Sequence, residues 1–170
     1  DRYVALKVLP RYFASDPEFV GRFNQEARML AKLQHPRILA VHDFGESEGY
    51  SYIVMPFVDS GTLDDLLQGQ PLSMLQTAQV VNQVAEALDY AHSFGVVHRD
   101  VKPGNVLIDR SGNCLLTDFG IAKMVAGTDH YTRTGGTIGT PAYMSPEQIQ
   151  GEKLDGRSDV YSLGIMLYEM

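Results

Sequence analysis

Two short motifs constrain this chain more than any other feature of its 170 residues. The run His98-Arg99-Asp100-Val101-Lys102-Pro103-Gly104-Asn105 supplies a base, a cation and an amide. Asp118-Phe119-Gly120 follows and supplies a carboxylate that can face them. The His, Arg, Asp and Asn of the first run recur at this spacing by chance only once in roughly 10⁵ positions, given ordinary amino-acid usage. Together the motifs predict a single active centre.

The residue types in these motifs suit phosphoryl transfer, which has charge to neutralise and little covalent chemistry for the protein to perform. Asp100 is the expected catalytic base, accepting the proton of an attacking hydroxyl. Asn105 and Asp118 offer oxygen ligands suited to Mg²⁺, which takes one or two protein groups plus phosphate oxygens and water. Lys7 lies on an apolar predicted strand and needs an anionic neighbour, because burying an unpaired lysine is costly.

Composition narrows the class of protein. A content of 44% hydrophobic and 21% charged residues is ordinary for a globular domain, and the net charge of −7 argues against binding nucleic acid or an anionic membrane. No apolar stretch approaches the roughly 18 residues of a membrane span. The single cysteine, Cys114, excludes an internal disulfide and is expected to be a buried hydrophobe. It suits a reducing compartment, so we expect a cytoplasmic location.

Hydrophobic periodicity predicts the order of the elements. In the first half we expect a strand at 4–9, a helix from Asp16 to Leu33, and strands at 38–44 and 50–56 joined by a turn at 45–49. In the second half we expect a long helix at 73–94, capped by Ser73, with one face toward the core at Val80, Val81, Val84, Leu88 and Ala91. Short strands at 106–108 and 114–117, a loop at 127–139 and a final helix from Ser158 should follow.

The chain resembles the protein kinase superfamily from end to end. Val4-Ala5-Leu6-Lys7 is similar to the strand that carries the nucleotide lysine, and Ser145-Pro146-Glu147 to the motif that closes the activation segment. Bacterial, eukaryotic-like Ser/Thr kinases are most similar. The resemblance implies a bilobal α+β fold, with residues 1–57 as part of a small β-rich lobe and 58–170 as part of a helical lobe. It also implies a Gly-rich phosphate loop before residue 1 and further helices after residue 170.

The implied activity is transfer of the γ-phosphate of ATP, with Mg²⁺, to Ser or Thr hydroxyls of proteins. Lys102 would steady the transferring phosphate, and Asn105 and Asp118 would hold the metal. Lys7 would contact the α- and β-phosphates and pair with Glu26, at the family's separation of 19 residues. The remaining residues that the resemblance places at the nucleotide are Ala5, Met55, Pro56, Val58 and Leu107.

The resemblance also implies regulation. Four residues align with the stacked regulatory residues of the family, namely Leu30, Val41, His98 and Phe119. Asp159 would anchor the loop that carries the base. Arg99 would pair with a phosphate on the activation loop, at Thr132 or Thr134 and next at Thr137, through autophosphorylation between two copies. Thr140 would touch Asp100 and Lys102 and position the substrate.

Two alternatives stay open. A pseudokinase would bind without catalysis, although such proteins usually lack at least one of the residues that are present here. A small-molecule kinase of related fold is disfavoured by the segment 139–147, which resembles a peptide-holding segment. The isolated 170 residues are expected to be poorly soluble and nearly inactive, because an uncovered sheet edge and an exposed apolar helix face would remain.

Overall fold

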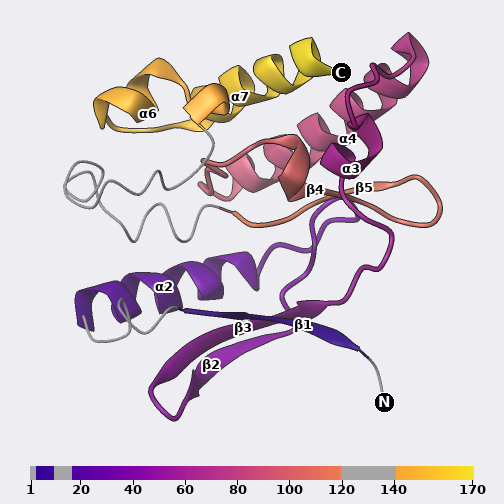
Figure 1. Ribbon diagram of the computed structural model, residues 1–170. Coiled ribbons are helices and arrows are strands. Elements are labelled where there is room, and N and C mark those ends of the chain that lie inside the picture. The colour runs from indigo at the N-terminus through magenta and orange to yellow at the C-terminus, as the bar shows by residue number, and fades with distance from the viewer. Residues whose placement is uncertain (1–2, 10–16, 120–140) are drawn as a thin grey trace.

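The computed structural model describes residues 3–9, 17–119 and 141–170 (Figure 1). The predicted regulatory residues Thr132, Thr134, Thr137 and Thr140 lie outside these ranges. The described elements are β1 Val4–Val8, α2 Pro17–Leu30, β2 Asp43–Ser47, β3 Tyr50–Pro56, α3 Leu63–Leu67, α4 Met74–Ser93, η1 Pro103–Asn105, β4 Val106–Ile108, β5 Cys114–Leu116, η3 Pro141–Tyr143, α6 Pro146–Gln150 and α7 Gly156–Glu169.

The N-terminal part is a small sheet covered by one helix. Its three strands are antiparallel in the order β1-β3-β2, and Lys7 of β1 lies opposite Ile53 of β3. Helix α2 runs along one face of this sheet (Figure 1) and buries Phe23, Ala27 and Leu30. These residues recur at helical spacing, so the helix is confirmed, although it ends at Leu30 rather than at the predicted Leu33.

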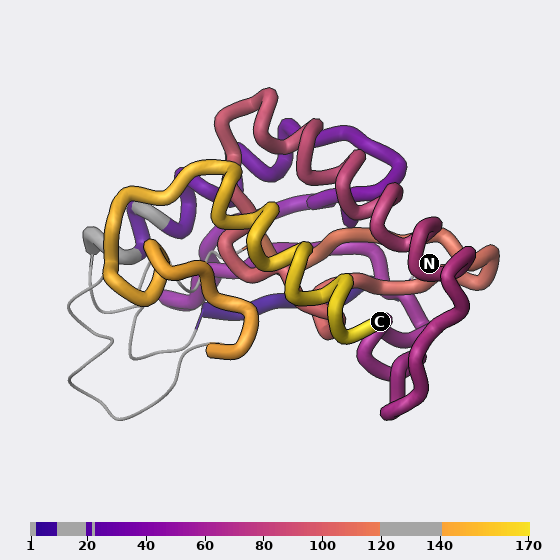
Figure 2. Tube along the Cα trace, turned by 90° about the horizontal axis from the view of Figure 1, so that it is seen from above, coloured from indigo at the N-terminus to yellow at the C-terminus, as the bar shows by residue number. Residues whose placement is uncertain are grey.

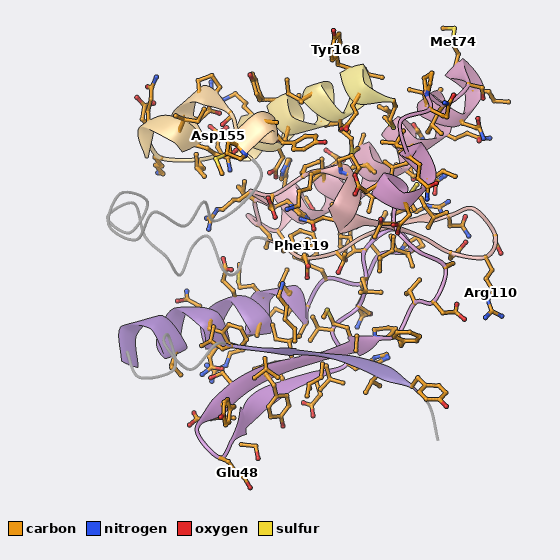
Figure 3. The ribbon with its side chains drawn as sticks, viewed as in Figure 1. Glu48, Met74, Arg110, Phe119, Asp155 and Tyr168 are labelled. Atoms are coloured by element: carbon orange, nitrogen blue, oxygen red, sulfur yellow. The ribbon has the colours of Figure 1, made fainter. Side chains whose placement is uncertain are left out.

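The strand predicted at 38–44 is wrong. The hairpin partner of β3 is Asp43–Ser47, and the turn is only Glu48-Gly49, at the tip labelled in Figure 3. Both turn residues have positive φ, 51° and 77°, which is the two-residue turn that matches the twist of antiparallel strands. Ile38 instead forms an isolated parallel bridge with Leu116 of β5. Ile38 is buried by this contact between two parts of the molecule and not by a strand of its own. A short apolar run looks the same in the sequence in both cases.

The long helix α4 is confirmed together with its cap. Ser73 Oγ accepts a hydrogen bond from Gln76 N, and Gln76 Oε1 accepts one from Ser73 N, which is a capping box. The helix ends where Gly95, at φ 72°, donates to the carbonyl of His92 while the next residue donates to Ala91. This Schellman motif turns the chain out of the helix and toward the first sequence motif.

Helix α7 packs beside α4, as Figures 1 and 2 both show. It begins earlier than predicted, at Gly156 rather than Ser158, because the Asp155 side chain accepts from Arg157 N and caps it. Cys114 is buried as expected, and burial raises the pKa of its thiol. No helix within the described ranges is long and apolar enough to span a bilayer.

The hairpin β4–β5 lies between the small sheet and the long helices (Figure 1). Arg37 joins it to the N-terminal part, because its guanidinium donates to Asn113 Oδ1 at 2.7 Å and its carbonyl accepts from Leu116 N at 2.8 Å. The α+β class and the arrangement of a small β-rich part and a helical part are confirmed. The division at residues 57 and 58 stays a prediction.

Candidate active site

One buried carboxylate holds the backbone of the first motif. Asp159, in the first turn of α7, is fully buried. Its Oδ2 accepts from His98 N at 2.7 Å and lies 2.7 Å from His92 Nε2, and its Oδ1 accepts from Arg99 N at 2.7 Å. The predicted role of Asp159 as the anchor of this loop is therefore confirmed. Two of these three hydrogen bonds come from the consecutive N–H groups of His98 and Arg99, so the carboxylate fixes the backbone just before Asp100.

His98 acts as a neutral link between the two motifs. Its Nδ1 accepts from Asp100 N at 3.2 Å, so its Nε2 carries the proton and donates to the carbonyl of Thr117 at 2.9 Å. Burial lowers the pKa of His98, against the opposing effect of the negative charge of Asp159. The ring also packs against Phe119, with centroids 4.5 Å apart. The loop of the base and the second motif are thus held in a fixed relation.

The predicted base Asp100 is held by two residues of its own loop. Asn105 Nδ2 donates to the carbonyl of Asp100 at 2.7 Å and to its Oδ2 at 2.9 Å. Lys102 Nζ lies 3.3 Å from the same Oδ2. The Asp100 side chain is 18% exposed, so its carboxylate is oriented and still reachable by a substrate hydroxyl. The structure brings together three of the predicted catalytic residues.

The second motif meets β1 at an ion pair. Asp118 follows β5 with φ 58°, a left-handed conformation that is uncommon outside glycine. Its Oδ1 lies 2.7 Å from Lys7 Nζ. Both residues line a largely apolar cavity together with Leu30, Ile38, Leu39, Val41, Ile53, Met55, Thr117 and Phe119. Phe119 lies between the α2 side and the helical side of the molecule (Figure 3).

The expected pairing of Lys7 with Glu26 is not present in this structure and stays a prediction for the nucleotide-bound protein. Glu26 Oε1 instead lies 3.6 Å from Arg99 Nη1, and within the described residues Lys7 pairs with Asp118 alone. Burial raises the pKa of Glu26, and the charge of Arg99 partly opposes that shift. A partly exposed lysine can pair with any carboxylate that lies close to it, so spacing in the sequence could not choose between Glu26 and Asp118.

The predicted regulatory stack is brought together in part. Leu30, Val41 and Phe119 line the same cavity, and Phe119 contacts His98 as described above. Arg99 has φ 68° and a buried Nε with no hydrogen-bond partner among the described residues.

The remaining predicted nucleotide residues lie on β1, at and just after the end of β3, and on β4. Ala5 is opposite Met55 in the register of β1 and β3, and Pro56 ends β3 two positions before Val58. Leu107 is opposite Leu115 in β4–β5 and forms a bridge with Thr62. Met55 lines the cavity described above. That these residues contact an adenine stays a prediction.

The residues proposed for Mg²⁺ fit a hard ion. Asn105 is 6% exposed, and because its Nδ2 is engaged by Asp100, its Oδ1 remains as an oxygen ligand. Thr117 N donates to the carbonyl of Asn105 at 3.0 Å. The residue that is hydrogen-bonded to Asn105 is therefore the chain neighbour of Asp118. In the described ranges, no group of three or more His, Cys, Asp or Glu could hold a metal. Oxygens from a bound phosphate would have to complete the coordination.

The sequence reasoning missed Gln148. Its side chain accepts from Ser145 N at 3.0 Å and donates to the carbonyl of Arg99 at 2.8 Å. The signal was present, because Ser145-x-x-Gln148 has the spacing of a capping box for α6. The neighbouring Glu147 accepts a hydrogen bond from Ser158 Oγ at 2.6 Å.

The chain is similar to known proteins along its whole length. A scan of protein families matches residues 1–170 to the protein kinase domain. It is 45% identical over 174 residues to serine/threonine-protein kinase PknB of Mycobacterium leprae, covering 99% of this chain and 28% of that protein. It is 43% identical over 171 residues to the probable serine/threonine-protein kinase PknB of Lactococcus lactis, covering 100% of this chain and 27% of that protein.

Solved structures agree with the sequence matches. The crystal structure of the M. tuberculosis PknI kinase domain superposes with a TM-score of 0.78 at 38% identity, covering 97% of this chain and 60% of that one. In length, the chain spans less than a third of the two PknB proteins described above.

Proposed function

This chain belongs to the protein kinase family, and from that premise we propose that the whole protein is a Ser/Thr protein kinase that transfers the γ-phosphate of ATP to protein hydroxyls. The observation that carries the proposal is the arrangement at Asp100. The Asp100 carboxylate, whose side chain is 18% exposed, is fixed by Asn105, approached by Lys102 at 3.3 Å, and supported by the buried Asp159. This set of contacts orients a base and leaves it accessible.

The proposed chemistry divides between two groups of residues. Asp100 would accept the proton of the attacking hydroxyl, and Lys102, beside the same carboxylate, would place a positive charge by the transferring group. Asn105 and Asp118 would hold Mg²⁺, which when bound neutralises the charge of the phosphates. Lys7 would exchange the carboxylate of Asp118 for phosphate oxygens. The adenine would lie near Ala5, Met55, Pro56, Val58 and Leu107.

We expect Glu26 to form an ion pair with Lys7 when a nucleotide is bound. In the structure Glu26 faces Arg99 and Lys7 faces Asp118. Asp118 cannot serve a metal fully while it holds the ammonium of Lys7, because both cations compete for the same oxygens. A shift of Glu26 from Arg99 to Lys7 would free Asp118 and Arg99 together.

Regulation and location are proposed on the same basis. Arg99 would receive a phosphothreonine at Thr132 or Thr134 after transfer between two copies of the protein, since a phosphate brings roughly −1.5 to −2 charges and three acceptor oxygens. We expect the kinase domain to act in the cytoplasm on other proteins.

The test uses the whole purified protein with ATP and Mg²⁺. Transfer of labelled γ-phosphate is measured to the protein itself and to a generic protein rich in Ser and Thr, beside the variant Asp100→Asn. We expect transfer by the wild type and a loss of at least about 10³-fold in the variant, because the base is removed without changing the shape of the site. Transfer no greater than that of the variant would favour the pseudokinase alternative.

A further inference from the structure

Gln148 links two segments that the sequence separates by nearly fifty positions. One end of its side-chain amide, Oε1, accepts from Ser145 N at 3.0 Å and completes the cap of α6. The other end, Nε2, donates to the carbonyl of Arg99 at 2.8 Å, in the loop that carries the proposed base. A single amide therefore uses its acceptor for α6 and its donor for the catalytic loop.

The carbonyl that Gln148 holds belongs to the peptide that carries Asp100. The C=O of Arg99 and the N–H of Asp100 lie in one planar unit, so fixing one edge of the plane orients the other. The opposite edge is also held, because Asp100 N donates to His98 Nδ1 at 3.2 Å. Gln148 and His98 together determine the rotation of this peptide plane, and with it the direction in which the Asp100 side chain leaves the backbone.

The plane needs such support because Arg99 is in an uncommon conformation. Its φ of 68° lies in the left-handed region, which non-glycine residues keep only where their surroundings hold them there. Asp159 Oδ1 holds the N–H of Arg99 at 2.7 Å, and Gln148 holds its C=O at 2.8 Å. Without Gln148, only one side of this residue's backbone would be fixed by a side chain outside the loop.

The segment that carries Gln148 is itself hydrogen-bonded to helix α7. Ser162 Oγ of α7 donates to the carbonyl of Tyr143 at 2.7 Å, and Ser158 Oγ of α7 donates to Glu147 at 2.6 Å. Ser158 and Ser162 are both buried. Segment 143–148 is therefore attached to the same helix that supplies Asp159, so Gln148 acts from a platform that does not move independently of the loop.

We propose that Gln148 is a positioning residue for the base, which sets the orientation of Asp100 through the carbonyl of Arg99; this inference rests on the proposed kinase function. It assigns a task to the residue after the Ser145-Pro146-Glu147 motif. The donor of the amide serves catalysis, and its acceptor serves the stability of α6. The two tasks can be separated by substitution.

Three variants of the whole protein separate them. Gln148→Glu keeps an acceptor for Ser145 N and loses the donor. Gln148→Lys keeps a donor and loses the acceptor, and Gln148→Met is neutral and has neither. Gln150→Glu is the matched control, because Gln150 is an exposed residue of the same helix with no side-chain hydrogen bond to another described residue.

The kinetic readout is the split between kcat and the KM for ATP. We expect kcat to fall by about tenfold in the Glu and Met variants, the equivalent of one lost hydrogen bond, with the KM for ATP unchanged. Gln148→Lys should retain kcat within about threefold while its thermal midpoint falls, because only the cap is lost. A kcat that follows the thermal midpoint across all variants, or that is as high in Gln148→Glu as in Gln150→Glu, would overturn the proposal.

A second readout does not depend on activity. Hydrogen exchange of the backbone amides of residues 99–101 should be faster in Gln148→Met than in the wild type, and unchanged in Gln150→Glu. Unchanged exchange in Gln148→Met would overturn the link itself. If the wild type transfers no more phosphate than Asp100→Asn, the kinase function fails, and the exchange data still decide whether Gln148 fixes the loop.

Discussion

Lys7 Nζ lies 2.7 Å from Asp118 Oδ1, so one ion pair joins β1 to a residue two positions after the end of β5. The side chains are 35% and 42% exposed, and an ion pair with this much access to water contributes only about 0–1 kcal/mol to folding. The pair is therefore inexpensive to break. That property suits a site in which the lysine must pass to phosphate and the carboxylate to a metal ion.

The first prediction separates the two partners of this pair. Lys7→Met should lower phosphate transfer by at least about 100-fold, because a charge at the phosphates is lost, and should leave binding of Mn²⁺ intact. Asp118→Asn should lose both, since an oxygen ligand is weakened. Transfer assays, and Mn²⁺ titrations followed by electron paramagnetic resonance with a non-hydrolysable ATP analogue held at saturation, measure the two effects. Lys32→Met, at an exposed lysine, is the control. Wild-type transfer by Lys7→Met would contradict the proposed role.

Elements with local signals could be predicted from the sequence. The cap at Ser73 and the buried positions of α4 follow from residues within a few positions of one another, and both are confirmed. The strand at 38–44 failed because Ile38 is buried by a distant bridge to Leu116, and a short apolar run does not show which partner covers it.

The site was predictable in its residue types and less so in its contacts. Asp100, Lys102 and Asn105 occur within six positions, so their proximity follows from one loop. Glu26 and Lys7 depend on the relative placement of α2 and β1, and the structure gives each a different partner. Gln148 reaches Arg99 only through the packing of α6 on the loop, and no local pattern specifies that contact.

The second prediction concerns the anchor of the catalytic loop. Asp159→Asn replaces one carboxylate oxygen by an NH₂ group, which cannot accept a hydrogen bond. The backbone N–H of either His98 or Arg99 would then be buried without an acceptor. The free energy of unfolding should fall by about 3 kcal/mol. Denaturant unfolding of the whole protein measures this change. Asp89→Asn, at an exposed position on α4, should change it by less than about 0.5 kcal/mol. Equal effects in the two variants would contradict the anchoring role.

The third prediction tests the close packing of α7 on α4. A Cβ at Gly156 would lie 2.7 Å from His92 Nδ1, closer than van der Waals contact allows. Gly156→Ala should therefore destabilise the protein by about 1–3 kcal/mol, because His92 or the helix must shift. A Cβ at Gly164 in the same helix would meet nothing within 4 Å, so Gly164→Ala should be neutral or stabilising by up to about 1 kcal/mol. Thermal unfolding compares the two, and the opposite ranking would contradict this packing.

The last prediction follows from the neutral state of His98. Burial lowers the pKa of His98 below its ordinary value of 6.5, so below that pH the unfolded chain binds a proton that the folded protein does not. The contribution to stability is complete above pH 6.5 and is lost as the pH falls. Between pH 7.5 and 5.5 the free energy of unfolding should therefore fall, by at most about 1.4 kcal/mol for one proton taken up by the unfolded chain.

The variant His98→Gln isolates this contribution, because an uncharged amide can accept from Asp100 N and donate to the carbonyl of Thr117 as the imidazole does. Although the variant is less stable overall, its free energy of unfolding should decline less between pH 7.5 and 5.5 than that of the wild type. The opposite effect of Glu26, whose pKa is raised by burial, cancels in the comparison because both proteins contain it. The exposed His42→Gln should retain the wild-type decline. Parallel curves for the wild type and His98→Gln would mean that His98 is protonated in the folded protein, and the hydrogen bond from Asp100 N to its Nδ1 could not then exist.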